Sequence, residues 1–262
     1  MDILLTNDDG LLSPGMAALI QELATDHRLY VSAPDRQRSA AGGSMTIRNI
    51  LRAKPVPFWE HPEVRAYAVS GTPVDCVRLG FGRLFPRPEM VISGINLGPN
   101  RGTDVLYSGT CSAAQEAAIH GYPALAVSLD GSHERPFVHF ETAARLARRG
   151  LVLLQQRPLP FGGYYSINVP DLPLEEVKGI RYGHLGKVLY EAAYEERGEE
   201  AGELIYYECG QRIPNEEGPR DTDEYWLSQG YATVTALGYD CAIPLLGAEE
   251  EETLKPLKGN TI

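Results

Sequence analysis

Two adjacent aspartates near the start of the chain are the first residues whose type and spacing could do chemistry. The sequence TNDDG places Asp8 and Asp9 directly after a short apolar stretch, residues 2–6, which has the character of a buried strand. Asn, Asp and Gly all favour turns, so the same letters also fit an ordinary turn. Two neighbouring carboxylates at a buried strand end repel each other unless a cation compensates them, and hard oxygen ligands suit Mg²⁺, Mn²⁺ or Ca²⁺. The pair therefore predicts a divalent-metal site.

Further oxygen donors follow two later strand-like stretches. Ser39 lies in the loop APDRQRSAAGGSMT, whose small residues let backbone N–H groups approach an anion, although such a loop also suits a flexible surface segment. Asn96 follows the apolar stretch MVISGI, where its neutral amide oxygen could complete a metal shell. We therefore take Ser39 and Asn96 as candidate ligands of a metal and of a phosphate group.

A third candidate is the turn YSGT, which leads into an alanine-rich stretch with helical character. Ser108, Gly109 and Thr110 would stand at the N-terminus of that helix. Free N–H groups and the helix dipole make such a terminus a phosphate-binding place. The alternative is an ordinary N-cap, which is the commonest use of Ser and Thr at a helix start.

The elements that must position these residues alternate along the first part of the chain. Strand-like and helix-like stretches in this rhythm predict an α/β fold with a mostly parallel sheet and helices on both faces. In such sheets ligands bind outside the carboxyl ends of the strands, which is where each polar cluster falls. The predicted strands cover residues 2–6, 28–34, 89–96, 122–130, 163–170 and 231–240, and the predicted helices cover residues 15–26, 109–121 and 140–156.

The sequence predicts a single domain, residues 1–262, that consists of three parts. Residues 1–179 are predicted to form the core with the active site. Residues 180–245 are charged and rich in Tyr and Gly, so they predict protruding arms and one returning strand. Because aromatic side chains on extended arms tend to bury against a partner subunit, this part predicts a homo-oligomer. Residues 246–262 form an acidic tail.

Composition excludes several other classes. A net charge of −11 argues against a nucleic-acid polymer as partner, because few phosphate counterions could be replaced. No apolar run approaches the roughly 18 residues of a membrane span, and no signal peptide is visible. The four cysteines show no CxxC pair and predict reduced, mostly packed thiols in a cytoplasmic protein. His-rich metal clusters, GxSxG elbows and P-loops are also absent from the sequence.

These motifs in series resemble the SurE family of survival-protein nucleotidases. The stretches TNDDG, APDRQRSAAGGSMT, GTPVDCV, SGINLGPNRGTDVLYSGTCSAA and INVP carry the resemblance, which is dense over residues 1–130. It implies a three-layer αβα, Rossmann-like core with protruding C-terminal elements that mediate dimers or tetramers. It also implies hydrolysis of nucleoside 5′-monophosphates, and of 3′-monophosphates, with Mg²⁺ or Mn²⁺ as cofactor. The implied metal residues are Asp8, Asp9, Ser39 and Asn96, the set already selected from the residues. Departures at Gly43, Cys111 and Glu116-Ala117 leave substrate preference open.

The reaction predicted from these residues is metal-assisted hydrolysis of a phosphomonoester, as in 5′-nucleotidases and acid phosphatases. Asp8 and Asp9 are the catalytic candidates: we favour Asp9 as the group that orients or deprotonates water, and direct attack by Asp8 stays open. A haloacid-dehalogenase-type phosphatase is a rival, but it spaces its aspartates as DxD. A phosphorylatable receiver module is another rival, but it runs only about 120 residues and needs an acceptor Asp after its third strand and a Lys after its fifth. This chain is twice as long, and its five lysines fall elsewhere. A non-catalytic, Mg²⁺-dependent nucleotide sensor is the remaining alternative.

Overall fold

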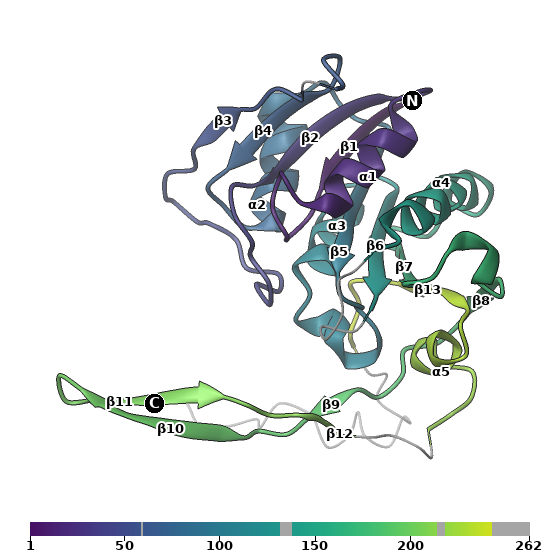
Figure 1. Ribbon diagram of the computed structural model, residues 1–262. Helices are drawn as coiled ribbons and strands as arrows, with labels where there is room; N and C mark the ends of the chain where they lie inside the picture. Colours follow the sequence, from purple (N-terminus) through teal and green to yellow (C-terminus); the bar gives the residue numbers. More distant parts are fainter. Residues whose placement is uncertain (59, 132–137, 214–217, 243–262) are drawn as a thin grey trace, which may run out of the picture.

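A computed structural model describes residues 1–58, 60–131, 138–213 and 218–242 of the 262-residue chain. Its main feature is a nine-stranded sheet with the strand order β3-β4-β2-β1-β5-β6-β7-β13-β8. The strands from β4 to β7 are parallel, and antiparallel pairs occur where β3 meets β4 and where β13 meets β7. The predicted α/β fold with a mostly parallel sheet is confirmed (Figure 1).

The elements of the core alternate as the sequence predicted. The sheet strands are β1 (Asp2–Thr6), β2 (Arg28–Pro34), β3 (Ala53–Pro55), β4 (Arg65–Val69), β5 (Met90–Leu97), β6 (Ala124–Asp130), β7 (Tyr164–Pro170), β8 (Ile180–Tyr182) and β13 (Ala232–Leu237). The helices are α1 (Pro14–Leu23), α2 (Pro73–Leu79), α3 (Gly109–Ile119), α4 (Phe140–Gln156) and α5 (Asp223–Ser228), with shorter helical turns at Gly80–Leu84, Gly102–Leu106 and Leu174–Glu176. The sequence prediction did not include β3, β4, α2 and α5; β3 spans only three residues, and the two helices span only seven and six residues.

Helices cover both faces of the sheet and divide its apolar side chains into two cores. One core joins the sheet to α1 and α4, and the other joins it to α2 and α3. On α1 the apolar side chains Met16, Leu19, Ile20 and Leu23, which recur at helical spacing, are all buried. Ser13 caps this helix by accepting a hydrogen bond from Met16 N, and Pro14 occupies its first turn, where a missing N–H costs nothing. The cap fixes where β1 turns into α1, next to the acidic pair.

A long two-stranded arm projects from this layered core (Figure 1). It consists of β10 (Tyr194–Glu200) paired with β11 (Glu203–Glu208), and at its base β9 (Leu189–Tyr190) pairs with β12 (Arg212–Ile213). Every residue of β10 and β11 is exposed. The sequence prediction of hairpins or arms after residue 180 is therefore confirmed for the described residues.

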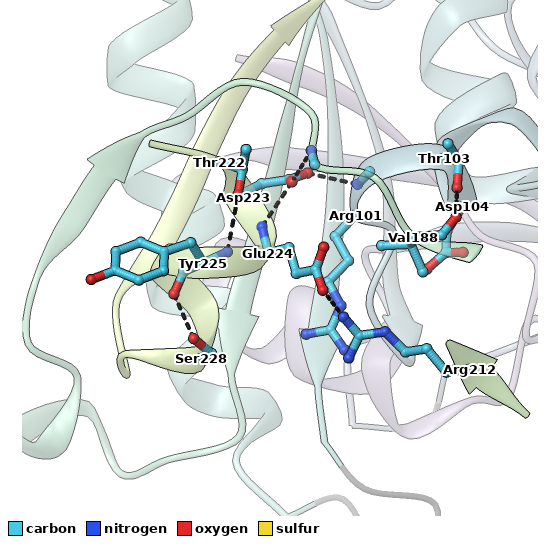
Figure 2. Close-up of polar contacts among 12 residues, drawn as sticks. Arg101, Thr103, Asp104, Val188, Arg212, Thr222, Asp223, Glu224, Tyr225 and Ser228 are labelled. Atoms are coloured by element: carbon cyan, nitrogen blue, oxygen red, sulfur yellow. Dashed lines mark hydrogen bonds and ion pairs between the residues drawn. The ribbon is translucent and has the colours of Figure 1, made fainter. Parts of the chain in front are cut away.

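The base of the arm is tied to the loop that follows β5 (Figure 2). Asp223, which is fully buried at the start of α5, accepts hydrogen bonds from Gly102 N at 2.9 Å and from Gly186 N at 2.8 Å. The hydroxyl of Tyr190 on β9 donates to Asp104 Oδ2, and Arg212 on β12 forms an ion pair with Glu224 on α5. The arm and the loop between β5 and α3 are thus anchored to the same short helix.

Some sequence predictions concern other parts of the chain. The acidic tail, residues 246–262, lies outside the described residues. Of the cysteines, Cys76 and Cys111 are buried, but Cys209 and Cys241 are exposed, so the prediction of mostly packed thiols holds for only half of them. Within the part of the chain that the structure describes, no helix has the length and apolar character needed to cross a membrane.

Candidate active site

The turn after β1 is held by the side chain of Asn7, which is fully buried. Asn7 Oδ1 accepts a hydrogen bond from Gly10 N, and Asn7 Nδ2 donates to Gly10 O and to Ser13 Oγ. Gly10 has a φ of +100°, a conformation that residues with a side chain rarely adopt. The backbone between Asn7 and Gly10 is therefore fixed, and with it the two aspartates.

Asp8 lies in a tight environment formed by the start of α3. Its side chain is only 4% exposed, and Asp8 Oδ1 accepts a hydrogen bond of 2.6 Å from the hydroxyl of Thr110. A Cβ atom added at Gly109 would lie 3.0 Å from Asp8 Oδ2 and 3.1 Å from Pro73 Cγ. Glycine at position 109 is thus what allows the helix start to approach the carboxylate so closely.

Burial is the main influence on the charge of Asp8. Loss of hydration raises the pKa of Asp8 from its ordinary 3.8 to about 6, and the neighbouring charge of Asp9 also raises it. The hydrogen bond from Thr110 acts in the opposite direction, because it stabilises the ionised form. The ionised form of Asp8 is therefore the costly one, and a positive charge bound beside it would stabilise that form.

Asp9 is more accessible and reaches two other segments. Asp9 Oδ2 accepts a hydrogen bond of 2.8 Å from Leu97 N, at the end of β5. Asp9 Oδ1 lies 3.4 Å from Gln37 Nε2, in the loop after β2. Burial raises the pKa of Asp9, and the hydrogen bonds from Leu97 and Gln37 lower it. The second carboxylate thus joins the ends of β1, β2 and β5.

Ser39 and Asn96 also lie at these strand ends. Ser39 Oγ accepts a hydrogen bond of 2.9 Å from Gln37 Nε2, the amide that also contacts Asp9. The pairing of β5 with β6 shifts in register between Ser93 and Asn96, so the end of β5 is irregular. Asn96 Nδ2 donates to Gly98 O at 2.7 Å, and among the described residues no donor occupies its Oδ1. Ser39 is thus linked to Asp9 through Gln37, and Asn96 directly precedes Leu97, whose N–H contacts Asp9.

The start of α3 combines the two roles considered for it. Ser108 Oγ accepts a hydrogen bond from Cys111 N, which is the ordinary N-cap arrangement. The Thr110 hydroxyl is used on Asp8, so it orients a carboxylate and is not left free for a ligand. A phosphate role for Ser108, Gly109 and Thr110 would have to use backbone N–H groups of this first turn.

Two residues that shape the site were not singled out from the sequence. Gln37 links Asp9 to Ser39, as described above. Asp75, in the first turn of α2, accepts hydrogen bonds from Thr46 N, from Thr46 Oγ1 and from Thr72 N, and so fixes the far end of the serine loop. The pattern Thr72-x-x-Asp75 is a capping box that the sequence contains and that could have revealed Asp75.

The donor set fits a hard divalent cation. Among the described residues no group of three or more His, Cys, Asp and Glu side chains could hold a metal, which leaves the aspartate pair with neutral oxygens beside it. Two carboxylates, a hydroxyl and an amide oxygen are ligands that Mg²⁺ and Mn²⁺ accept, with water filling the remaining positions. Burial raises the pKa values of Asp8 and Asp9, so their ionised forms are costly, and a bound cation would stabilise them.

The fold and the site together define the class of protein. The protein is an α/β protein with a parallel sheet and an acidic, oxygen-rich site at the carboxyl ends of its central strands. The family described as "Survival protein SurE" matches residues 3–192, and the chain belongs to this family. The resemblance recognised from the motifs is confirmed.

Relatives from several organisms align along nearly the full length. The chain is 43% identical to "5′-nucleotidase SurE" of Carboxydothermus hydrogenoformans over 92% of this chain and 91% of the relative. It is 42% identical to "5′/3′-nucleotidase SurE" of Proteus mirabilis, with 92% and 91% covered. Its fold is similar to the crystal structure of the SurE protein from Aquifex aeolicus, with a TM-score of 0.76, 34% identity and coverage of 92% and 95%.

Proposed function

We propose that this protein is a metal-dependent phosphomonoesterase that hydrolyses nucleoside 5′-monophosphates, and also 3′-monophosphates, to nucleoside and phosphate. Two relatives are named as a 5′-nucleotidase and a 5′/3′-nucleotidase. They are 43% and 42% identical to this chain, and each alignment covers more than nine-tenths of both chains. The observation that carries the proposal here is the buried Asp8, held by Thr110, next to the more accessible Asp9.

Asp8, Asp9, Ser39 and Asn96 would hold the Mg²⁺ or Mn²⁺ ion. When bound, such an ion acts as a Lewis acid: it neutralises charge on the phosphate and makes water a stronger acid. The part of Thr110 is to keep Asp8 ionised and oriented, because its hydroxyl donates to Asp8 Oδ1. Leu97 acts on Asp9 in a similar way, because its backbone N–H donates a hydrogen bond to Asp9 Oδ2.

Asp9 is the better candidate for the general base. Asp8 is only 4% exposed and both its oxygens lie against the start of α3, whereas the main contact of Asp9 Oδ1 is the long one to Gln37. In the proposed step a water oxygen bonds to phosphorus, and its proton passes to the Asp9 carboxylate. The P–O ester bond breaks, and the leaving oxygen takes a proton from solvent. Direct attack by Asp8 is disfavoured by its burial.

The other phosphate oxygens would be held by Ser39, Asn96 and the backbone N–H groups of the first turn of α3. The dipole of α3 favours an anion at this end, and donors already in place stabilise the charge that develops in the transition state. Gly42 N donates to Tyr107 O at 3.0 Å, which keeps the serine loop close to this helix start. That contact supports a shared role of the loop and the helix in holding one phosphate.

Release of phosphate from AMP tests the proposed function directly. We expect turnover with Mg²⁺ or Mn²⁺, loss of turnover when a chelator removes the ion, and recovery when the ion is restored. A calorimetric titration with AMP would be run in parallel. Binding of AMP with no phosphate released under any of these metals would make the protein a nucleotide sensor and would refute the enzyme.

Selection between bases is expected to be weak. The sequence shows no acidic residue at the usual distance after a GxGxxG turn and no obvious aromatic clamp that would read a base. We expect a panel of purine and pyrimidine monophosphates, sugar phosphates and short polyphosphate to show broad acceptance. Selection of a single base by more than about 10⁴ in kcat/KM would require buried polar contacts to that base and would contradict this expectation.

We also propose that the protein is a homodimer or homotetramer assembled through residues 180–245. The arm carries several large apolar side chains that are exposed in the single chain, which is unusual unless a partner covers them. They are Leu189, Tyr190, Tyr194, Leu204, Ile205, Tyr206, Tyr207 and Ile213.

Light scattering checks the assembly against the chain mass of 28.7 kDa. We expect a mass two or four times this value at micromolar concentration. Tyr206→Lys, on the arm, should shift the mass toward the monomer, whereas Phe161→Lys, also exposed but on the core, should not. A wild-type protein that is monomeric throughout would rule the assembly out.

A further inference from the structure

A cavity of about 550 Å³ lies at the base of the arm. It is bounded by β12, by the chain that leads into α5, by α5 itself and by the loop after β5 (Figure 2). This volume falls in the range of small-molecule sites, roughly 300–1,000 Å³. Of the described residues that line the cavity, none belongs to the proposed metal and phosphate site, so the nucleotidase chemistry gives it no role.

Three arginines from different parts of the chain line this cavity. Arg101 comes from the loop after β5, Arg212 from β12, and Arg220 from the segment just before α5. Among the described lining residues the one carboxylate is Glu224, on α5. Three positive charges therefore face one negative charge. In a chain whose net charge is −11, this concentration of positive charge in one hollow favours an anion as its ligand.

The described contacts leave much of the donor capacity of these arginines unused. A guanidinium group has five N–H donors. Arg101 Nη1 donates to Asp130 Oδ2 at 2.8 Å, but Arg101 Nε is buried and has no hydrogen-bond partner among the described residues. Arg212 forms its ion pair with Glu224, and no described carboxylate pairs with Arg220. Two carboxylates thus serve three guanidinium groups.

A phosphate group matches this lining better than a single carboxylate does. Guanidinium groups bind phosphate oxygens through pairs of parallel N–H donors. A phosphate ester carries nearly two negative charges at neutral pH and has three strong acceptor oxygens, enough to contact all three arginines. A carboxylate would bring only one charge and two oxygens. The size of the cavity leaves room for the rest of a small molecule beside the phosphate.

We propose that this cavity binds a small molecule that carries a phosphate group, with Arg101, Arg212 and Arg220 holding its oxygens. The site is separate from the acidic pair and does not depend on the proposed function. Its ligand would contact the arm, α5 and the loop after β5 at once. Asp223 already joins these segments through Gly102 N and Gly186 N, so the ligand would further stabilise the base of the arm.

Calorimetric titration with inorganic phosphate, in a chelator, tests the proposal. Without a cation the two carboxylates of the acidic pair repel phosphate, so the titration reports on the arginines. Arg220→Gln removes the arginine that has no described ion pair, and we expect Kd for phosphate to rise at least tenfold. The control is Arg197→Gln, which removes an exposed arginine of the arm that lies outside the cavity. It should leave Kd within about twofold of wild type.

A second pair of variants adds charge in place of removing it. Ser228 is exposed at the end of α5 and lines the cavity. Ser228→Glu brings a negative charge to the site and should also raise Kd at least tenfold, whereas Ser228→Gln, of the same size and uncharged, should stay within about threefold. Phosphate should raise the Tm of wild type and of Ser228→Gln, and it should raise the Tm of Ser228→Glu much less.

The same titrations with pyrophosphate and with AMP distinguish a free phosphate ion from a phosphate group on a larger molecule. The probe that binds wild type most tightly, and that loses affinity in both charge variants, identifies the form that the cavity takes. If none of the three probes binds wild type, the proposal is overturned.

Two further results would also refute the site. One is equal affinity of wild type, Arg220→Gln and Ser228→Glu for every probe that binds. The other is a change of assembly mass in Arg220→Gln with unchanged phosphate affinity, which would assign the arginines to a contact between subunits. Because these measurements need no turnover, they decide the question whether or not the protein hydrolyses AMP.

Discussion

Asp8→Asn should abolish turnover while the protein stays folded. The substitution keeps the size of the side chain, and the Thr110 hydroxyl can still donate to the amide oxygen at this position. It removes one of the two charges proposed to hold the cation, and Lewis-acid catalysis supplies several kcal/mol of transition-state stabilisation. Because each 1.36 kcal/mol is a factor of ten, we expect kcat/KM for AMP to fall by about 10³ or more.

The control for this variant is a carboxylate that has no part in the site. Asp26→Asn removes an exposed charge beside Arg148 and should leave kcat/KM within about twofold of wild type. Both proteins would be stripped of metal and reloaded before assay. Near-normal turnover of reloaded Asp8→Asn would show that the metal assignment is wrong.

The same variant should be more stable than wild type when no metal is present. The pKa of Asp8 in the folded protein, about 6, lies above its ordinary value of 3.8. Folding stability is therefore lost as the pH rises through this interval, because the buried side chain must ionise. Asn has no charge to bury, so its advantage at pH 8 is at most about 3 kcal/mol, from roughly two pKa units, and shrinks toward pH 5. Melting temperatures in chelator at the two pH values check this, and a lower Tm for Asp8→Asn at pH 8 would contradict it.

The positions of the candidate residues were predictable because parallel strands end at one edge of a sheet. Asp8 and Asp9, Ser39 and Asn96 each follow a strand that could be recognised as an apolar stretch, and the structure places these strands side by side as β2, β1 and β5. The alternation of strands and helices is a local property of the sequence. It therefore predicted both the fold class and the edge of the sheet at which the candidate residues lie.

The partners of these residues could not be predicted in the same way. The bond from Thr110 to Asp8 joins residues 102 positions apart, and the bond from Leu97 N to Asp9 joins residues 88 apart. Such pairs depend on the register of strands and on where α3 begins, and neither has a local signature. The capping box at Thr72 and Asp75 is different, because its spacing is visible and only its link to Thr46 is not.

The helix start at Ser108–Thr110 shows how a local pattern can be right and incomplete. The sequence offered a cap or a phosphate site, and the hydrogen bond to Cys111 N bears out the cap at Ser108. Neither alternative anticipated that the hydroxyl of Thr110 would donate to the carboxylate of Asp8. This third role changes what substitutions here should do.

Thr110→Ala should lower kcat/KM by one to two orders of magnitude, because it frees Asp8 to rotate and raises its pKa further. Thr110→Ser keeps the hydroxyl and should restore most of the activity, whereas Thr110→Val should behave like Ala. A residue that only capped the helix would cost about 1 kcal/mol of stability and leave the kinetics unchanged. Melting temperature and kcat/KM would therefore be measured on the same preparations.

Gly109→Ala should have the larger effect, because the added Cβ would lie only 3.0 Å from Asp8 Oδ2 and Asp8 Cβ and 3.1 Å from Pro73 Cγ. Either Asp8 or the first turn of α3 must move, and the proposed metal and phosphate positions move with them. We expect a loss in kcat/KM of at least 10², and inhibition by inorganic phosphate should weaken in parallel because the N–H groups of this turn are displaced.

Gly121→Ala, at the other end of the same helix and with open space around it, is the control for this variant. Because Gly121 has a φ of +80°, Gly121→Ala should lower the stability of the protein, but it should leave kcat/KM unchanged. Normal kinetics in Gly109→Ala would mean that α3 does not need to approach Asp8, and the phosphate role of this turn would be refuted with it.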